Sequence, residues 1–88
     1  MNNKKVRVSE QVALKIKQRQ IYLALIGKTV TNLMIGEKLW PESSPETQKQ
    51  NAFNLINGRT STIKIAHVKL LCELLDFDAN KLFNITKS

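Results

Sequence analysis

The strongest local constraint in this sequence is a helix that must end at a glycine and run directly into a polar turn. The stretch Asn54–Thr60 reads Asn-Leu-Ile-Asn-Gly-Arg-Thr. Gly58 can close a helix in the left-handed conformation without a steric penalty from a Cβ atom. The donors that follow it are Arg59, Thr60, Ser61, Thr62 and Lys64. Such side chains suit an anionic backbone better than a protein core, and they point to DNA binding.

Helix starts, stops and apolar spacing predict an all-α chain with five helices. No segment alternates convincingly with period two, so we expect no strand. Ser9, Thr31, Ser44 and Asp78 are suitable N-caps, whereas Gly27 and Pro41 are suitable stops. The predicted helices span residues 10–26, 32–40, 45–57, 64–75 and 79–83. A basic arm over residues 1–8 and a frayed tail over residues 84–88 complete a single domain, residues 1–88.

The apolar positions of these helices define the expected core. In the first helix we assign Val12, Ile16, Leu23 and Ile26 to the core, joined by Ala13, Leu14 and Leu25. A surface-lying membrane helix over residues 10–26 is conceivable, but a chain this small needs its apolar residues inside. Cys72 is expected to be a small buried hydrophobe. We expect Phe53 at the edge of the core, with a thymine methyl group or a partner subunit as its alternative contacts, and His67 on a helix surface.

Charge is concentrated near the N-terminus. The formal net charge is +7. Residues 1–28 hold seven Lys or Arg against one Glu, and residues 29–88 hold seven against six acids. An excess at one end indicates an anionic partner, either nucleic acid or a membrane surface, although a basic composition can also serve solubility alone.

Several classes of function are disfavoured. The single cysteine, Cys72, allows no disulfide within the chain and fits a reducing cytoplasm. No apolar run reaches the ~20 residues that span a bilayer, and no signal peptide is evident. One histidine and one cysteine make a poor metal site, and no phosphate-binding loop or activated nucleophile is present. We therefore expect no enzyme activity, cofactor, metal, small-molecule substrate or membrane partner, and a cytoplasmic location.

The third helix has an unusual outer face. Ala52, Leu55 and Ile56 mark its buried side, with Gln48 at the upper end of that side. The opposite side carries Gln50 and Asn54 with Thr47 beside them. Asn and Thr are poor helix formers, whereas side-chain amides match the donor and acceptor edge of adenine in the major groove. A solvated face without function is the alternative, and the basic turn behind the helix favours DNA.

Residues 31–83 resemble the helix-turn-helix domain of phage lambda repressor and Cro-like regulators. The resemblance is carried by the Thr31 helix with Ile35, Gly36 and Lys38-Leu39, then Asn54–Arg59, Val68–Leu75 and Asp78–Phe83. It implies that the third helix enters the major groove while the second lies across it. The connection 40–44 is longer than usual in the family and contains Pro41, and we therefore expect the third helix to start at an unusual angle.

The resemblance also implies contact residues. Base-reading positions map onto Lys49, Gln50 and Asn51, with Thr47 and Asn54 nearby, and phosphate contacts map onto Thr31, Asn32, Arg59 and Thr60. The basic side chains Lys28 and Lys64 are further phosphate candidates. The expected function is a small sequence-specific regulator that binds double-stranded DNA. Such regulators usually pair on two-fold sites, and the long first helix either widens the phosphate contact or forms a dimer surface. An antitoxin-like module that binds a protein partner as well as DNA is the alternative.

Overall fold

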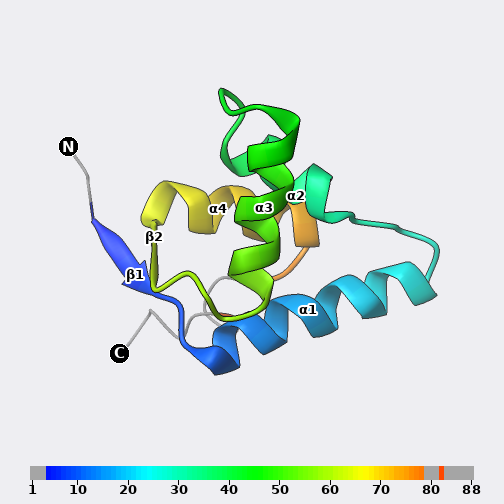
Figure 1. Ribbon diagram of the computed structural model, residues 1–88. Coiled ribbons are helices and arrows are strands. Elements are labelled where there is room, and N and C mark those ends of the chain that lie inside the picture. Colours follow the sequence, from blue (N-terminus) through cyan, green and yellow to red (C-terminus); the bar gives the residue numbers. More distant parts are fainter. Residues whose placement is uncertain (1–3, 79–81, 83–88) are drawn as a thin grey trace.

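The computed structural model describes residues 4–78 and 82, and it combines four helices with one small sheet (Figure 1). The elements in chain order are β1 (Lys5–Arg7), α1 (Glu10–Leu25), α2 (Asn32–Leu39), α3 (Pro45–Ile56), β2 (Thr62–Lys64) and α4 (Ile65–Leu75). The all-α prediction is confirmed only in part: the chain is predominantly helical, but the expectation of no strand is wrong, because β1 and β2 pair in a two-stranded sheet. The predicted count of five helices is not supported, since the fifth, Ala79–Phe83, lies outside the described residues except for buried Leu82.

The predicted caps hold three helices at their starts. Ser9, Thr31 and Ser44 each accept a hydrogen bond from the backbone N–H three residues later, at 3.1 to 3.2 Å. These bonds satisfy amides that have no partner inside the helix. Pro45 follows Ser44 as the first residue of α3, where its missing N–H costs nothing. The start of α3 therefore agrees with the prediction despite the long connection before it.

The prediction of a basic arm over residues 1–8 is wrong for residues 4–8, because this segment forms part of a strand pair. Lys5–Arg7 pairs antiparallel with Thr62–Lys64, and the N–H of Val8 donates to the Ser61 carbonyl at 2.8 Å. Val8 and Ile63 are buried, whereas Lys5, Arg7, Thr62 and Lys64 are exposed. The strand forms because burying alternate apolar side chains offsets the entropy of ordering so short a segment.

The predicted core of α1 is only half right. Ala13, Ile16 and Leu23 are buried, and Val12 packs against the core while remaining partly exposed. Leu14, Leu25 and Ile26 are exposed, contrary to the prediction. The buried positions of α4 agree better, and Cys72 is buried as expected.

A glycine sets how closely α2 approaches α3. A Cβ atom at Gly36 would overlap the backbone oxygen of Gln48. Gln48 is only 5% exposed, and its side-chain amide donates to the Trp40 carbonyl at 3.0 Å. That bond satisfies a buried polar group and ties α3 to the turn that precedes it. Gln48 therefore lies on the buried side of α3, as predicted.

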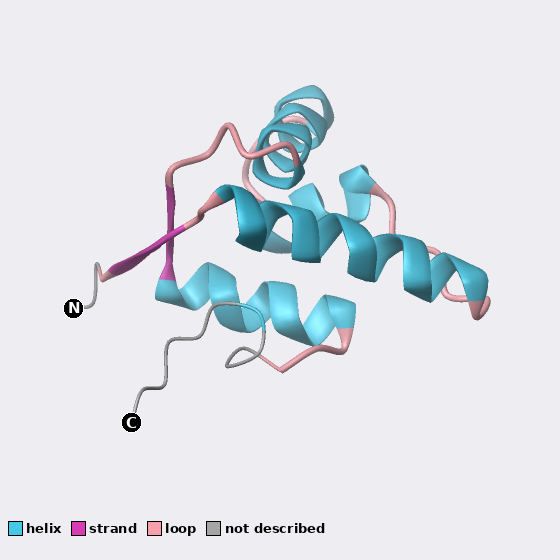
Figure 2. Cartoon of the chain, turned by 90° about the horizontal axis from the view of Figure 1, so that it is seen from below, coloured by secondary structure: helices cyan, strands magenta, loops and turns pink. Residues whose placement is uncertain are grey.

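The four helices place α3 on an open side of the molecule. α1 runs across the bottom of Figure 1, with α3 standing above its first half. Figure 2 views the molecule from below and shows α1 nearest the viewer, between α3 and α4. α3 therefore forms the front of the molecule in Figure 1, α4 the back, and α1 the lower edge.

Candidate nucleic-acid interface

The outer face of α3 carries an ordered pair of amides. The Gln50 amide nitrogen donates to the Asn54 side-chain oxygen at 3.1 Å, one helical turn away. The bond uses neither the Gln50 oxygen nor the Asn54 amide nitrogen, so the pair presents an acceptor beside a donor. Thr47 lies on the same face, and its hydroxyl accepts from Ser44 at 3.1 Å. The structure thus brings three of the predicted base-reading residues together.

The two remaining base-reading candidates lie on opposite flanks of α3. Lys49 and Asn51 differ by 200° around the helix, from about 100° per residue. Lys49 shares a surface hollow with Glu46, Gln50 and Phe53, whereas Asn51 faces the β1–β2 ribbon. Lys49 is therefore separated from the Thr47–Asn54 side of the face.

The helix stop at Gly58 positions Arg59 beside α3. Gly58 has φ +74°, its N–H donates to the Leu55 carbonyl at 3.4 Å, and the Arg59 N–H donates to the Asn54 carbonyl at 2.8 Å. These two bonds form a Schellman closure. The Arg59 guanidinium then lies 5.5 Å from the centre of the Phe53 ring. Phe53 is 41% exposed, so the prediction that it packs at the core edge is wrong.

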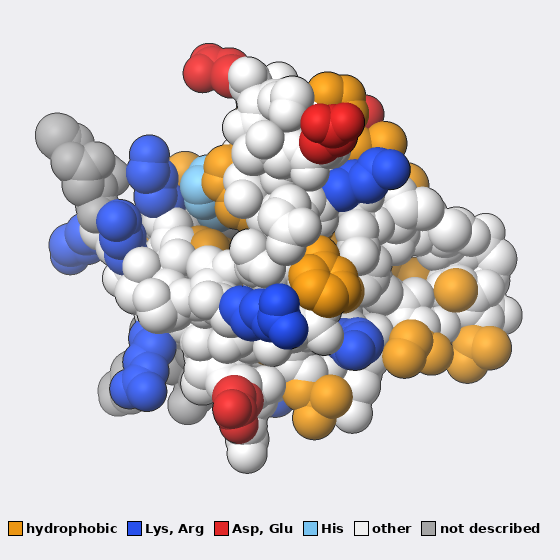
Figure 3. Space-filling model, in the orientation of Figure 1, with side chains coloured by type: hydrophobic (Ala, Val, Ile, Leu, Met, Phe, Trp, Pro, Cys, Tyr) orange, Lys and Arg blue, Asp and Glu red, His pale blue; other side chains and the backbone are white. Residues whose placement is uncertain are grey.

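The exposed side of the β1–β2 ribbon is strongly basic. Lys5 lies directly opposite Lys64 in the ladder, and Arg7 lies opposite Thr62. Like charges in opposing positions destabilise a strand pair. Figure 3 shows basic side chains gathered on the left of the face that α3 also occupies. An anionic partner on this face would relieve the repulsion between the two lysines.

A hollow of about 260 Å³ lies between the ribbon and α3. Its lining includes Lys5, Trp40, Asn51, Thr60, Lys64 and His67. Lysine, threonine and asparagine side chains at its wall are donors of the kind that contact phosphate oxygens. The structure therefore places the predicted phosphate contacts Thr60 and Lys64 together, and adds Lys5.

His67 is less accessible than the sequence suggested. Its ring packs edge-on against Trp40, with centroids 5.4 Å apart, and its Nδ1 atom is buried without a hydrogen-bond partner. Burial lowers the pKa of His67 below 6.5, the positive charge of Lys64 lowers it further, and the Leu39 carbonyl acts in the opposite direction. The imidazole is therefore held in its neutral form beside a group of cations.

The remaining phosphate candidates lie on the other flank of α3. Lys28, Thr31 and Asn32 belong to the α1–α2 connection and the first turn of α2, at the right of Figure 1, whereas the ribbon lies at the left. Asn32 accepts from Gln20 at 3.1 Å, and Gln20 also donates to the Val30 carbonyl at 2.8 Å. Two separate groups of candidates thus flank one polar helix face.

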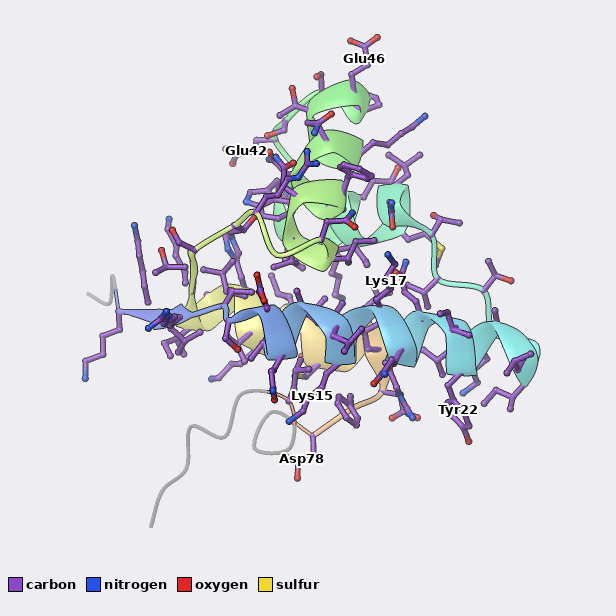
Figure 4. All side chains as sticks on the ribbon, turned by 60° about the horizontal axis from the view of Figure 1, so that its bottom comes forward. Lys15, Lys17, Tyr22, Glu42, Glu46 and Asp78 are labelled. Carbon is purple, nitrogen blue, oxygen red and sulfur yellow. The ribbon has the colours of Figure 1, made fainter. Side chains whose placement is uncertain are left out.

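The acidic residues near α3 limit where a polyanion can approach. Glu42 and Glu46 lie at the upper end of α3, the end remote from α1 (Figure 4). Their charges disfavour phosphates close to that end. The ribbon and the turn after α3 are the electrostatically favoured side.

Other kinds of site find little support. Over residues 4–78, together with Leu82, no three His, Cys, Asp or Glu side chains gather closely enough to hold a metal ion. None of the helices in that part of the chain is long and apolar enough to cross a bilayer. Comparisons with protein-family models, with curated proteins and with solved structures gave no match to this chain.

Proposed function

We propose that this chain binds double-stranded DNA in a sequence-specific manner, as a small cytoplasmic transcriptional regulator of the bacterial or phage type. The observation that carries the proposal is the α2–turn–α3 unit, packed through Gly36 against Gln48. It turns an amide-and-hydroxyl face outward beside a basic ribbon. In this proposal the unit acts as a helix-turn-helix, in which the second helix of the unit enters the major groove.

In this proposal the polar face reads bases. Gln50 and Asn54 present an acceptor and a donor side by side, which matches the N6 and N7 edge of adenine. Thr47 and Asn51 extend the same contact along one side of the helix, and Phe53 is placed to touch a thymine methyl group. Lys49, on the opposite flank, is a weaker candidate, because it is separated from Thr47 and Asn51.

The basic groups on either side of α3 position the protein on the phosphate backbone. Arg59, Thr60 and Lys64 belong to the group at the ribbon, and Lys5 and Arg7 join them as contacts that the sequence did not reveal. Lys28, Thr31 and Asn32 belong to the other group. Contacts of this kind supply affinity without sequence information, whereas the amides of α3 supply the discrimination.

A second candidate function is an antitoxin-like module that binds a protein partner as well as DNA. The observation that favours it is the exposed apolar surface of α1, because such surfaces mark protein contacts. Purification from the source cell separates the two proposals. A stable, stoichiometric second protein supports the module, whereas a chain that purifies alone argues against it.

Selection of preferred duplexes from a random pool tests the main proposal. We expect one enriched sequence, bound with an affinity that falls steeply as salt rises, by a slope of about −0.9 for each phosphate neutralised. Binding without enrichment would contradict base reading by α3. Binding with a flat salt response would contradict the basic contacts at the ribbon and the α1–α2 connection.

A further inference from the structure

The outer side of α1 is apolar where a solvent-facing helix is normally polar. Ile21, Tyr22, Leu25 and Ile26 are all exposed within six residues, with Leu25 at 80% and Ile21 at 56%. Figure 3 shows apolar side chains gathered at the lower right, over the end of α1. Contiguous exposed apolar surface usually marks an interaction site in a protein of this size.

The exposed residues follow the spacing of a helix-pairing seam. The stripe consists of Leu14, Gln18, Ile21 and Leu25, at intervals of four, three and four residues. This is the a and d spacing with which two helices interlock. The stripe lies on the side of α1 opposite buried Ile16 and Leu23, and it runs for about 16 Å along the helix.

We propose that this stripe binds the same stripe on a second copy of the chain, with the two α1 helices antiparallel. Leu14 of each copy then faces Leu25 of the other, and Gln18 faces Ile21. These pairs form four layers along the contact. The two outer layers each pack one leucine against another, and the two inner layers each pack a glutamine against an isoleucine.

Charge selects both the partner and the direction. Residues 10–19 carry Glu10, Lys15, Lys17 and Arg19, whereas residues 20–27 carry no charge. Figure 4 shows Lys17 and Lys15 on opposite flanks of the helix. A parallel pair would set Lys17 beside Lys15 of the second copy, because a two-fold axis along the helices brings opposite flanks together. An antiparallel pair instead sets the charged segment of each copy against the neutral segment of the other. Antiparallel helix dipoles also attract each other.

The antiparallel pair leaves both α3 faces on one side of the dimer. The use of this arrangement to bind DNA rests on the proposed function. The two-fold axis of such a pair runs perpendicular to α1 within the contact plane. With α1 across the bottom of Figure 1, that axis follows the viewing direction, and rotation about it keeps α3 at the front. A parallel pair would turn one α3 to the back. Only the antiparallel dimer can present two α3 helices to one DNA duplex.

The contact is small, so the dimer should be reversible. Two helices paired over four layers bury less than the roughly 800 Å² per partner of a standard interface. We expect monomers at low concentration and dimers at high concentration, with DNA favouring the dimer by mass action.

Sedimentation velocity over a range of protein concentrations tests the association. The 10.0 kDa chain should approach twice that mass as concentration rises. Leu25→Glu should remain monomeric at every concentration, and it should still fold because Leu25 is exposed. Phe53→Glu, which makes the same change at an exposed apolar residue of α3, should still dimerise. A wild-type chain that stays monomeric, or a Leu25→Glu chain that dimerises, would overturn the proposal.

Cross-linking tests the direction. Proteins carrying Leu14→Cys or Leu25→Cys are mixed and oxidised, while the native Cys72 stays buried. An antiparallel pair yields the mixed disulfide between the two proteins. Disulfides formed only between identical proteins would show a parallel pair and overturn the proposed arrangement.

The outcomes separate this inference from the proposed function. A dimer that enriches no duplex keeps the inference and removes the DNA-binding proposal. A monomer that enriches a single half-site does the reverse. A chain that is monomeric alone but purifies with a stoichiometric foreign protein on α1 overturns the self-association and supports the antitoxin-like module.

Discussion

Helices α1 and α3 pack into the same core, yet the sides that they leave to solvent have opposite chemistry. α3 exposes amides and a hydroxyl, with Gln50 bonded to Asn54. α1 exposes a row of aliphatic side chains that includes Ile21 and Leu25. Neither side resembles an ordinary helix surface rich in Glu, Lys and Ala. The contrast suggests that the two sides meet different partners, one polar and one apolar.

The two helices are also held differently. α3 touches α2 backbone to backbone, at a position where only glycine fits. α1 is fixed partly by long side chains that reach distant carbonyls. Arg19 donates to the carbonyls of Leu75 and Asp76 at 2.9 and 2.6 Å, and its guanidinium lies against the rings of Tyr22 and Phe77. These contacts fix which side of α1 faces the core.

The largest effect on stability should come from truncating a buried leucine of α1, with an exposed leucine of the same helix as the control. Leu23→Ala should lower the free energy of unfolding by about 2–5 kcal/mol, because it leaves a cavity in the core. Leu25→Ala removes the same atoms two residues later and should change it by less than about 0.5 kcal/mol. Urea unfolding at a concentration where the chain is monomeric measures both. Equal losses of unfolding free energy in the two variants would mean that the apolar side of α1 is not exposed to solvent in the monomer.

Gly36→Ala tests whether the polar side of α3 depends on close packing. The added methyl group overlaps the Gln48 backbone, and we expect a loss of about 1–3 kcal/mol or more in thermal unfolding. Gly27→Ala is the matched control, because its surroundings are open and only its φ of +88° opposes a side chain. That strain is about 1 kcal/mol. A smaller loss at Gly36 than at Gly27 would contradict the tight α2–α3 contact.

Two exposed residues separate base reading from backbone contact. Gln50→Ala should reduce discrimination between the selected duplex and its single-base variants by about 1–3 kcal/mol, with folding unchanged. Arg59→Ala should weaken binding to all sequences alike and make the salt slope shallower by about 1. Gln11→Ala, an amide on α1, serves as the control. Unchanged discrimination in Gln50→Ala would show that α3 is not the reading helix.

Local sequence rules accounted for much of the helical framework. Helix caps and stops depend only on residues that are neighbours in the sequence. The structure has all four that were predicted, namely the caps at Ser9, Thr31 and Ser44 and the stop at Gly58. The same 100° spacing that buries Gln48 also places Gln50 on the outer side of α3.

Non-local contacts account for the errors. Apolar residues occur all around α1, so spacing alone could not decide which side faces the core, and Arg19 makes that choice through contacts 56 and 57 residues away. The ribbon has a short alternating signal at Lys5–Val8 and again at Thr62–Lys64. Each segment is too brief to indicate a strand before the other is known. Lys5 and Arg7 were missed as candidate contacts for the same reason.

The smallest expected effect concerns His67, which lies at the edge of the polar side. Because burial and Lys64 lower its pKa in the folded state, the unfolded chain takes up the proton first as pH falls through 6.5. The contribution of His67 to stability is therefore complete above pH 6.5 and is lost below it, toward the lower folded pKa. His67→Gln should remove this part of the pH dependence.

The chain has a single histidine, so its NMR titration can be assigned without ambiguity. In the free protein we expect the pKa below 6.5, in line with burial and the nearby Lys64. A bound duplex should raise it, because phosphates at Thr60 and Lys64 would offset the lysine charge. A duplex that binds without raising the His67 pKa would place the phosphate backbone away from the ribbon and leave α3 with only the contacts near Lys28. The titration thus tells apart the two flanks between which the polar side of α3 lies, and it does so without altering any residue of either.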